Sequence, residues 1–248
     1  MVALFTIGQA SGAAISITFN ANRTLAPGDV TGAEVVVGNW NNLLVSGGNQ
    51  NGVWGSLNDS SGTATTASIT TDSWGGIVSM STDGSPFTKL YEGGLAKEGD
   101  VPSGSATINL SSIPYSQYDV YIYYTHFPIG SDTLQTWTES EGNTTLYGTN
   151  NKNHGHDWGD FVQYQTSDRA TAIAQATTAG PDGGGNWLKF TGLTASTLTL
   201  TSSDQNAPDI SGWKQRGIAG LQIVQVPEPS VLGLLALAPA LALRRRRA

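Results

Sequence analysis

Two histidines and two aspartates in one polar stretch are the residues whose types and spacing could bind a metal ion. His154 and His156 are separated by one residue, and Asp157 and Asp160 follow them. On an extended segment, alternate side chains project to the same side, so both imidazoles could reach one ion. Neutral imidazole binds Zn, Cu, Ni or Fe, and either aspartate could supply an oxygen ligand. The stretch is therefore a candidate transition-metal site.

The same stretch resembles the first motif of the cupin family, in which a glycine, five further residues and His-x-His are followed by an acid. Gly148 and His154 have that spacing, but Asp160 stands where the family has glutamate, and the downstream glycine is displaced. The second cupin motif needs a later histidine, and the sequence has none after His156. We favour the interpretation of this stretch as a polar loop with solvated histidines.

Tryptophan is prominent in this chain, with seven residues, and several of them lie in polar stretches that suit carbohydrate binding. A flat indole can stack on the apolar face of a sugar ring, while asparagine side chains bond to the hydroxyls. Large aromatic side chains also fill protein cores, so burial is the alternative for each of them. The ligand-binding candidates are Asn39, Trp40, Asn41, Trp137 and Trp158.

Paired carboxylates near aromatic residues could hydrolyse glycosidic bonds, which requires an acid and a base or nucleophile about 5–10 Å apart. The close pairs are Glu139 with Glu141, and Asp157 with Asp160. No Gly-x-Ser-x-Gly element of a serine hydrolase occurs. Such pairs are common in loops, so we expect the protein not to be an enzyme. Asp-Gly turns leave a structural Ca²⁺ ion open as the one cofactor to consider.

The composition predicts an acidic body that is rich in β-structure and turns. The 248 residues include 31 glycines and no cysteine, so the core must hold without disulfides. Four of the 12 basic residues and one of the 19 acidic residues lie after residue 225. Residues 1–225 therefore carry 8 positive and 18 negative charges, a net charge of −10. This charge argues against nucleic acid as a partner.

Alternating apolar residues predict an all-β body, a single β-sandwich or jelly-roll domain over residues 15–225. Tyr118–His126 carries bulky residues on both faces, as a central strand does. A short helical piece is expected around Leu90–Leu95, and Trp187 and Trp213 are expected in or near the core. The other predicted strands are Ile15–Phe19, Glu34–Val37, Thr63–Thr71, Gly75–Met80, Ala106–Leu110, Thr144–Tyr147, Asp160–Gln165, Trp187–Thr191, Thr197–Thr201 and Gly217–Val226. Residues 1–14 are a candidate remnant of an export signal, although they lack the usual basic residues.

The last 23 residues, 226–248, have three parts in order. Val226, Pro227, Glu228 and Pro229 form a short motif, Val231–Leu243 is apolar, and the arginines Arg244, Arg245, Arg246 and Arg247 close the tail. The arginines predict a cytoplasmic end under the positive-inside rule. As a short hydrophobic helix, Ser230–Leu243 would measure about 21 Å against a membrane core of about 30 Å. This length suits a temporary anchor better than a permanent one.

This tail resembles the PEP-CTERM sorting signal on the residues just quoted. The resemblance implies recognition of Val226–Pro229 by an exosortase-type membrane transpeptidase, which removes the tail. It implies an exported, membrane-anchored precursor and then a protein of the cell envelope or extracellular matrix. A plain C-terminal tail anchor is the alternative.

The body is similar to those that accompany this tail in planctomycete and verrucomicrobial proteins, which have no assigned activity. The similarity lies in Asn39–Asn42, Tyr118–Tyr124, Trp187–Thr194 and Arg216–Val224. We expect a structural or adhesive envelope protein. A carbohydrate-binding module with polysaccharide as its partner is the alternative, followed by a glycoside hydrolase and a cupin-like metal-binding protein.

Overall fold

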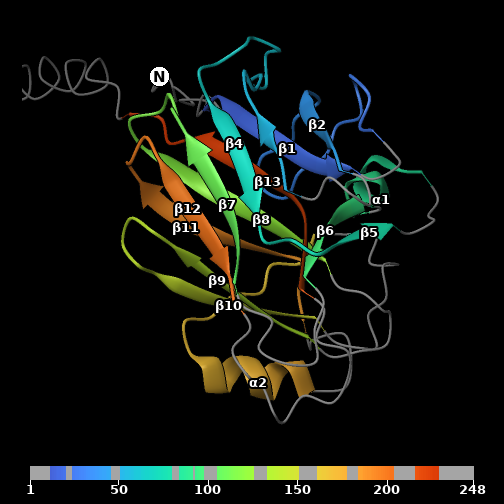
Figure 1. Ribbon diagram of the computed structural model, residues 1–248, viewed down its shortest axis with the longest axis vertical. Helices are drawn as coiled ribbons and strands as arrows, with labels where there is room; N and C mark the ends of the chain where they lie inside the picture. Colours follow the sequence, from blue (N-terminus) through green and yellow to red (C-terminus); the bar gives the residue numbers. More distant parts are fainter. Residues whose placement is uncertain are drawn as a thin grey trace, which may run out of the picture.

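The described part of the protein is dominated by β-strands that form two sheets, with two short helices (Figure 1). A computed structural model describes residues 12–20, 24–45, 51–79, 84–91, 93–97, 105–125, 133–150, 161–177, 184–203 and 216–228. The predicted all-β class is confirmed at this level.

The first sheet has seven strands, and its main path runs in the order β11-β8-β13-β1-β2. β6 pairs with β13 and with β5, while β2 runs parallel to β1 at one edge. The strands are β1 (Ala14–Asn20), β2 (Trp40–Leu44), β5 (Gly76–Ser79), β6 (Gly93–Lys97), β8 (Tyr118–Thr125), β11 (Trp187–Leu193) and β13 (Arg216–Gln225).

The second sheet has six strands in the order β10-β9-β12-β7-β4-β3, and all of its pairings are antiparallel. The strands are β3 (Val53–Trp54), β4 (Ser68–Asp72), β7 (Ala106–Ser111), β9 (Thr133–Glu139), β10 (Thr145–Asn150) and β12 (Leu198–Ser202). Helix α2 (Arg169–Thr177) packs on β9 and β10 (Figure 1).

The main hydrophobic core draws residues from both sheets. Ile15 and Ile17 of β1 join the same buried cluster as Ile108 and Leu110 of β7. In β13, Ile218 and Leu221 both belong to this cluster although they are three positions apart and a regular strand would place them on opposite faces. A register shift between Ile218 and Gly220 accounts for this. A side chain at Gly220 would place its Cβ 2.5 Å from the Ile17 carbonyl oxygen, so glycine is required there.

The opposite face of the first sheet carries a second cluster, which is mostly aromatic. Tyr121 and Tyr123 of β8 point to this face, while Tyr118, Val120, Ile122 and Tyr124 point to the main core. Helix α1 (Pro86–Tyr91) and residues 24–39 cover the aromatic cluster. The prediction of a strand buried on both faces is therefore confirmed, because β8 lies between β11 and β13 and contacts both clusters.

Several predicted elements differ from the observed ones. Glu34–Val37 and Asp160–Gln165 were predicted as strands, but their described residues form only isolated bridges at Val37 and Gln163. The helical piece ends at Tyr91, and residues 93–97 form β6. Four strands and one helix lie where no such element was predicted: β2, β3, β6, β9 and α2.

Neither helix in the described ranges is long and apolar enough to cross a membrane. The predicted short C-terminal helix lies outside the described residues, as does most of the candidate export-signal remnant at residues 1–14.

Candidate functional site

Asparagines around Trp40 form a small pocket beside the edge strand β2. Asn42 fixes one wall, because its Oδ1 accepts the Leu25 backbone N–H at 2.8 Å. Its Nδ2 donates to the carbonyl oxygens of Leu25 at 2.9 Å and Trp40 at 3.2 Å. These bonds fasten the chain at Leu25 against β2.

Asn41 fixes the opposite wall, which is the turn that begins at Asn58. Asn41 Oδ1 accepts the Asn58 backbone N–H at 2.8 Å, and Asn41 Nδ2 donates to the Asn58 carbonyl oxygen at 2.8 Å. Asp59 closes the turn by accepting backbone N–H groups from Ser61 at 2.8 Å and Thr63 at 3.0 Å. The Asn41 amide is therefore bonded within the protein, and its role in ligand binding stays a prediction.

The pocket has a volume of about 160 Å³ and is lined by both apolar and amide side chains. The apolar lining residues are Leu25, Pro27 and Trp40, the amide residues are Asn39, Asn42 and Asn58, and Gly38 and Gly62 complete the lining. We call this the Asn–Trp pocket.

Two amide side chains of the pocket lining have hydrogen-bonding groups without a partner among the described residues. Asn39 Nδ2 donates to the Ser60 carbonyl oxygen at 2.8 Å, and its Oδ1 has no partner among the described residues. The exposed Asn58 side chain makes no hydrogen bond within that same part of the chain. These groups are available to a ligand.

Trp40 contributes to the pocket wall but is not an open stacking surface. Its side chain is 7% exposed, and its ring packs against Tyr123 with centroids 6.0 Å apart. The indole Nε1 donates to the Val37 carbonyl oxygen at 3.2 Å. A ligand in the pocket would touch only a small part of the indole.

The remaining tryptophan predictions divide between core residues and residues outside the described ranges. Trp137 is fully buried in β9, where its ring lies 6.2 Å from that of Trp74. The prediction of Trp137 as a sugar-binding residue is therefore corrected, because neither indole face is open to solvent. The predicted burial of Trp187 is confirmed. Trp158 and Trp213 lie outside the described residues.

The predicted metal ligands His154, His156, Asp157 and Asp160 all lie outside the described residues. Within the described ranges, no three His, Cys, Asp or Glu residues are arranged to hold a metal ion.

The glutamate pair considered for glycoside hydrolysis is bonded to backbone N–H groups instead. Glu139 is 1% exposed and accepts N–H groups from Glu141 at 2.6 Å, Gly142 at 2.9 Å and Thr144 at 2.8 Å. Burial acts to raise the pKa of Glu139, but these hydrogen bonds outweigh it and the pKa is lowered. Glu141 accepts the N–H groups of Thr194 and Ala195, and its pKa is also lowered, chiefly by the Thr194 hydroxyl. A lowered pKa disfavours the general-acid role.

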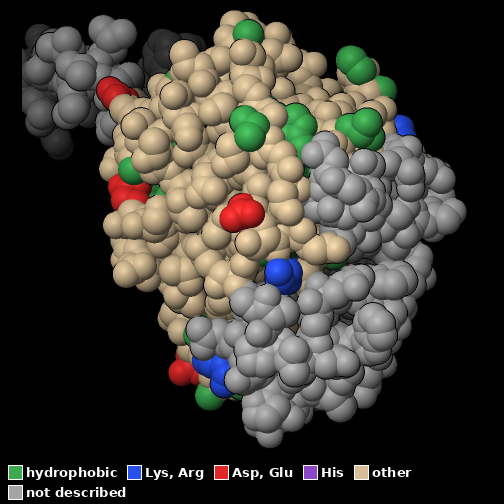
Figure 2. Space-filling model, in the orientation of Figure 1, with side chains coloured by type: hydrophobic (Ala, Val, Ile, Leu, Met, Phe, Trp, Pro, Cys, Tyr) green, Lys and Arg blue, Asp and Glu red, His purple; other side chains and the backbone are tan. Residues whose placement is uncertain are grey.

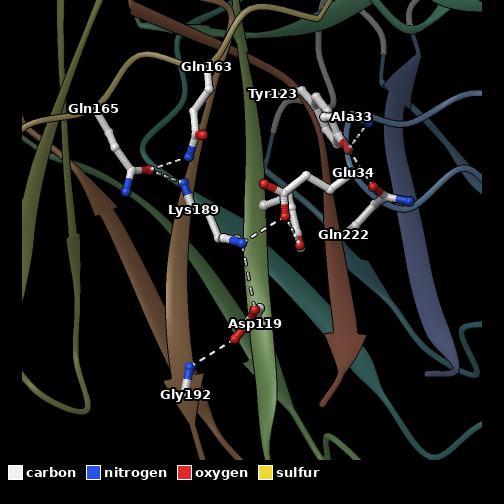
Figure 3. Close-up of polar contacts among 10 residues, drawn as sticks. Ala33, Glu34, Asp119, Tyr123, Gln163, Gln165, Lys189, Gly192 and Gln222 are labelled. Carbon is white, nitrogen blue, oxygen red and sulfur yellow. Dashed lines mark hydrogen bonds and ion pairs between the residues drawn. The ribbon is translucent and has the colours of Figure 1, made fainter. Parts of the chain in front are cut away.

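A charged cluster that the sequence did not reveal lies on the outer face of the first sheet (Figure 3). Lys189 Nζ is 2.7 Å from Glu34 Oε2 and 4.0 Å from Asp119 Oδ2. The Tyr121 hydroxyl donates to Glu34 Oε2 at 2.8 Å, and Lys189 Nζ lies 5.2 Å from the Tyr121 ring centroid. Burial raises the pKa of Tyr121, and its bond to Glu34 raises it further. Two carboxylates flank Lys189, so the cluster fastens residues 24–39 to β8 and β11.

The first three residues of the predicted sorting motif follow β13 directly. The Val226 backbone N–H donates to the Gln117 carbonyl oxygen at 2.9 Å, and the exposed Glu228 accepts a bond from Ser116 Oγ at 2.9 Å. Pro227 is also exposed. Pro229 and the arginines Arg244, Arg245, Arg246 and Arg247 lie outside the described residues.

Asn42 and Asn58 were absent from the sequence-based candidates. The available signal was local: Asn42 follows the Asn-Trp-Asn triplet, and Asn58 opens an Asn-Asp turn. The contact of Asn41 with Asn58 depends on folding across 17 residues, which no local pattern encodes. In comparisons with known proteins, no family, curated protein or solved structure matches this chain.

Proposed function

We propose that this chain is an exported protein of the cell envelope or extracellular matrix, with a structural or adhesive β-sandwich or jelly-roll body. In this proposal, the PEP-CTERM tail delivers it there. The observation that carries the proposal is the position of the motif: Pro227 and Glu228, which follow β13 closely, are exposed at the protein surface, and Val226 is half-buried. A processing enzyme could reach them without unfolding the body.

Each part of the tail has its own role in this proposal. Pro227 has no N–H group, so it cannot continue the hydrogen-bonding ladder of β13. Val231–Leu243 holds the precursor in the membrane, and Arg244–Arg247 keep its end in the cytoplasm. The partner is an exosortase-type membrane transpeptidase, which recognises Val226–Pro229 and removes the tail.

The non-enzymatic role of the body rests on how its polar groups are used. Glu139 and Glu141 bind backbone N–H groups, and Lys189 is flanked by Glu34 and Asp119. These groups stabilise turns and covering segments. The β-sandwich architecture is supported by the single buried cluster that both sheets share.

The test of the sorting proposal uses two changes to the full precursor in a host that carries the transpeptidase. Deleting residues 229–248 should release unprocessed protein and leave the contacts of Val226 and Glu228 intact. Pro227→Ala with Glu228→Ala keeps the apolar segment and the arginines, so it should leave the precursor uncut in the membrane. Unchanged processing of the double variant would refute the sorting signal and favour a plain tail anchor.

Carbohydrate binding is a second candidate function, and the Asn–Trp pocket favours it. The pocket combines an apolar wall with two amide side chains that have free hydrogen-bonding groups. This combination suits a polar ligand with one apolar face.

A further inference from the structure

We infer that the Asn–Trp pocket binds a single neutral sugar ring, such as a terminal residue of a polysaccharide. The inference deepens the adhesive role proposed above and rests on it. The polar contacts to the ligand come from Asn39 and Asn58, and the largely buried Trp40 contributes only part of its ring.

The asparagines divide into those that build the pocket and those that can bind a ligand. Asn41 and Asn42 use their amides to fasten the two walls. Asn39 is held by one bond from Nδ2, which leaves Oδ1 as a positioned acceptor. Asn58 offers both an acceptor and donors, since only its backbone is bonded to Asn41. The free groups lie on a wall that is already fixed, which reduces the entropy lost on binding.

The lining selects against charged ligands and against fully apolar ones. None of the described lining residues is charged, and the neighbouring carboxylates of Asp29 and Asp59 are already bonded to Lys89 and Ser61. A charged ligand would therefore be desolvated without an opposite charge. An apolar ligand would cover the free groups of Asn39 and Asn58 without bonding to them, which is also costly. A neutral polyol with one apolar face could contact the apolar lining residues and also form hydrogen bonds with Asn39 and Asn58.

The volume of the pocket limits the bound part of the ligand to about one sugar ring. Its volume of about 160 Å³ is below the roughly 300–1,000 Å³ of drug-sized sites. It could hold several waters at about 30 Å³ each, which one sugar ring could displace. Leu25, Pro27 and the exposed part of Trp40 would contact the apolar face of that ring.

The test is a binding measurement on the full chain, kept in a detergent without a sugar headgroup. Methyl glycosides of glucose, galactose, mannose, rhamnose and N-acetylglucosamine serve as neutral probes, and methyl glucuronide serves as the charged probe. Saturation-transfer NMR reports contact with the protein, and a titration followed at the Trp40 indole N–H gives the affinity. The variant is Asn58→Ala, whose side chain makes no bond within the described protein. Gln163→Ala, an exposed amide outside the pocket lining, is the matched control.

We expect at least one neutral glycoside to bind and to shift the Trp40 indole resonance. Loss of one or two hydrogen bonds in Asn58→Ala should weaken binding about three- to tenfold, while Gln163→Ala leaves it unchanged. The inference is overturned if no neutral probe binds, if Asn58→Ala binds as well as the parent, or if methyl glucuronide binds more tightly. Sorting of the precursor is measured separately, so loss of sugar binding and loss of sorting are distinguishable.

Discussion

At the scale of single residues, several polar side chains bind backbone groups rather than forming open sites. Asn41, Asn42, Asp59 and Glu139 each fasten a turn or a neighbouring segment. Sequence alone identifies which groups can form hydrogen bonds, but the partner is set by the fold. Glu141, for example, bonds to Thr194, which lies 53 residues away. For this reason the sequence shows that Glu139 and Glu141 are close together but not that both bind backbone N–H groups.

Glu139→Gln should destabilise the protein by about 2 kcal/mol, because a buried charged acceptor of three backbone N–H groups is replaced by a neutral amide. The measurement is urea unfolding followed by tryptophan fluorescence. Glu141→Gln is the control, since Glu141 is exposed at the same turn, and it should cost no more than about 1 kcal/mol. Equal losses in the two variants would contradict the special role of the buried carboxylate.

The contribution of Glu139 should also depend on pH. Its pKa in the folded protein is lowered from the ordinary value of 4.5, so the folded state favours the ionised form. The stabilisation is complete above the unfolded pKa and is lost as pH falls through the folded pKa. The difference in unfolding free energy between wild type and Glu139→Gln should therefore be constant near neutral pH and shrink below pH 4.5. A difference that grows on acidification would reverse the assigned sign.

At the scale of secondary-structure elements, the strands with clear alternation were predicted and the polar ones were missed. β1, β7, β8, β11, β12 and β13 lie where alternating or doubly apolar patterns placed them. β2 and β9 were not recognised because asparagine, threonine and glutamine occupy many of their positions. Residues 34–37 have the apolar composition of a strand, but Val35 and Val37 pack against the aromatic cluster instead. Helix α2 lacks a strong apolar stripe, so its apolar pattern does not predict it. The better sequence signal for this helix is its N-terminal cap, Asp168, whose carboxylate accepts the Thr171 N–H at 2.6 Å.

Two ion pairs hold the covering segment 24–39, and their removal should loosen it selectively. Lys89 Nζ contacts Asp29 Oδ2, and Lys189 Nζ contacts Glu34 Oε2, each at 2.7 Å. In the double variant Lys89→Met and Lys189→Met, the Thr31 and Val37 amides should exchange with solvent faster by about three- to tenfold, because each partly exposed pair contributes about 0.2–1 kcal/mol.

The control for this experiment is Lys97→Met, which removes a lysine that bonds to Ser73 outside the covering segment. Exchange of the β8 amides should stay unchanged in both variants. Uniform acceleration across the first sheet would mean that the ion pairs stabilise the whole domain rather than the cover.

At the scale of the whole molecule, the exposed apolar side chains of the described residues are scattered over the surface. On the face shown in Figure 2, hydrophobic side chains appear as separate spots, mostly in the upper part of the view. In the part of the chain that the structure describes, the exposed large hydrophobic residues are Val30, Val36, Leu44, Val53 and Val162. Isolated apolar residues of this kind are normal on protein surfaces. The stability of the folded protein therefore depends on its buried residues, and mainly on the hydrophobic cluster that both sheets share.

A cavity made in one sheet should therefore destabilise the other sheet by the same amount. Ile108 of β7 is fully buried in the shared cluster, so Ile108→Ala should cost about 2–5 kcal/mol. The most slowly exchanging amides of β1 and β13, in the first sheet, should lose the same protection as those of β12. Leu44→Ala removes an apolar side chain that is 65% exposed and should change stability by no more than about 0.5 kcal/mol. Loss of protection confined to β4, β7 and β12 would show that the sheets unfold independently, and the β-sandwich proposal would then fail.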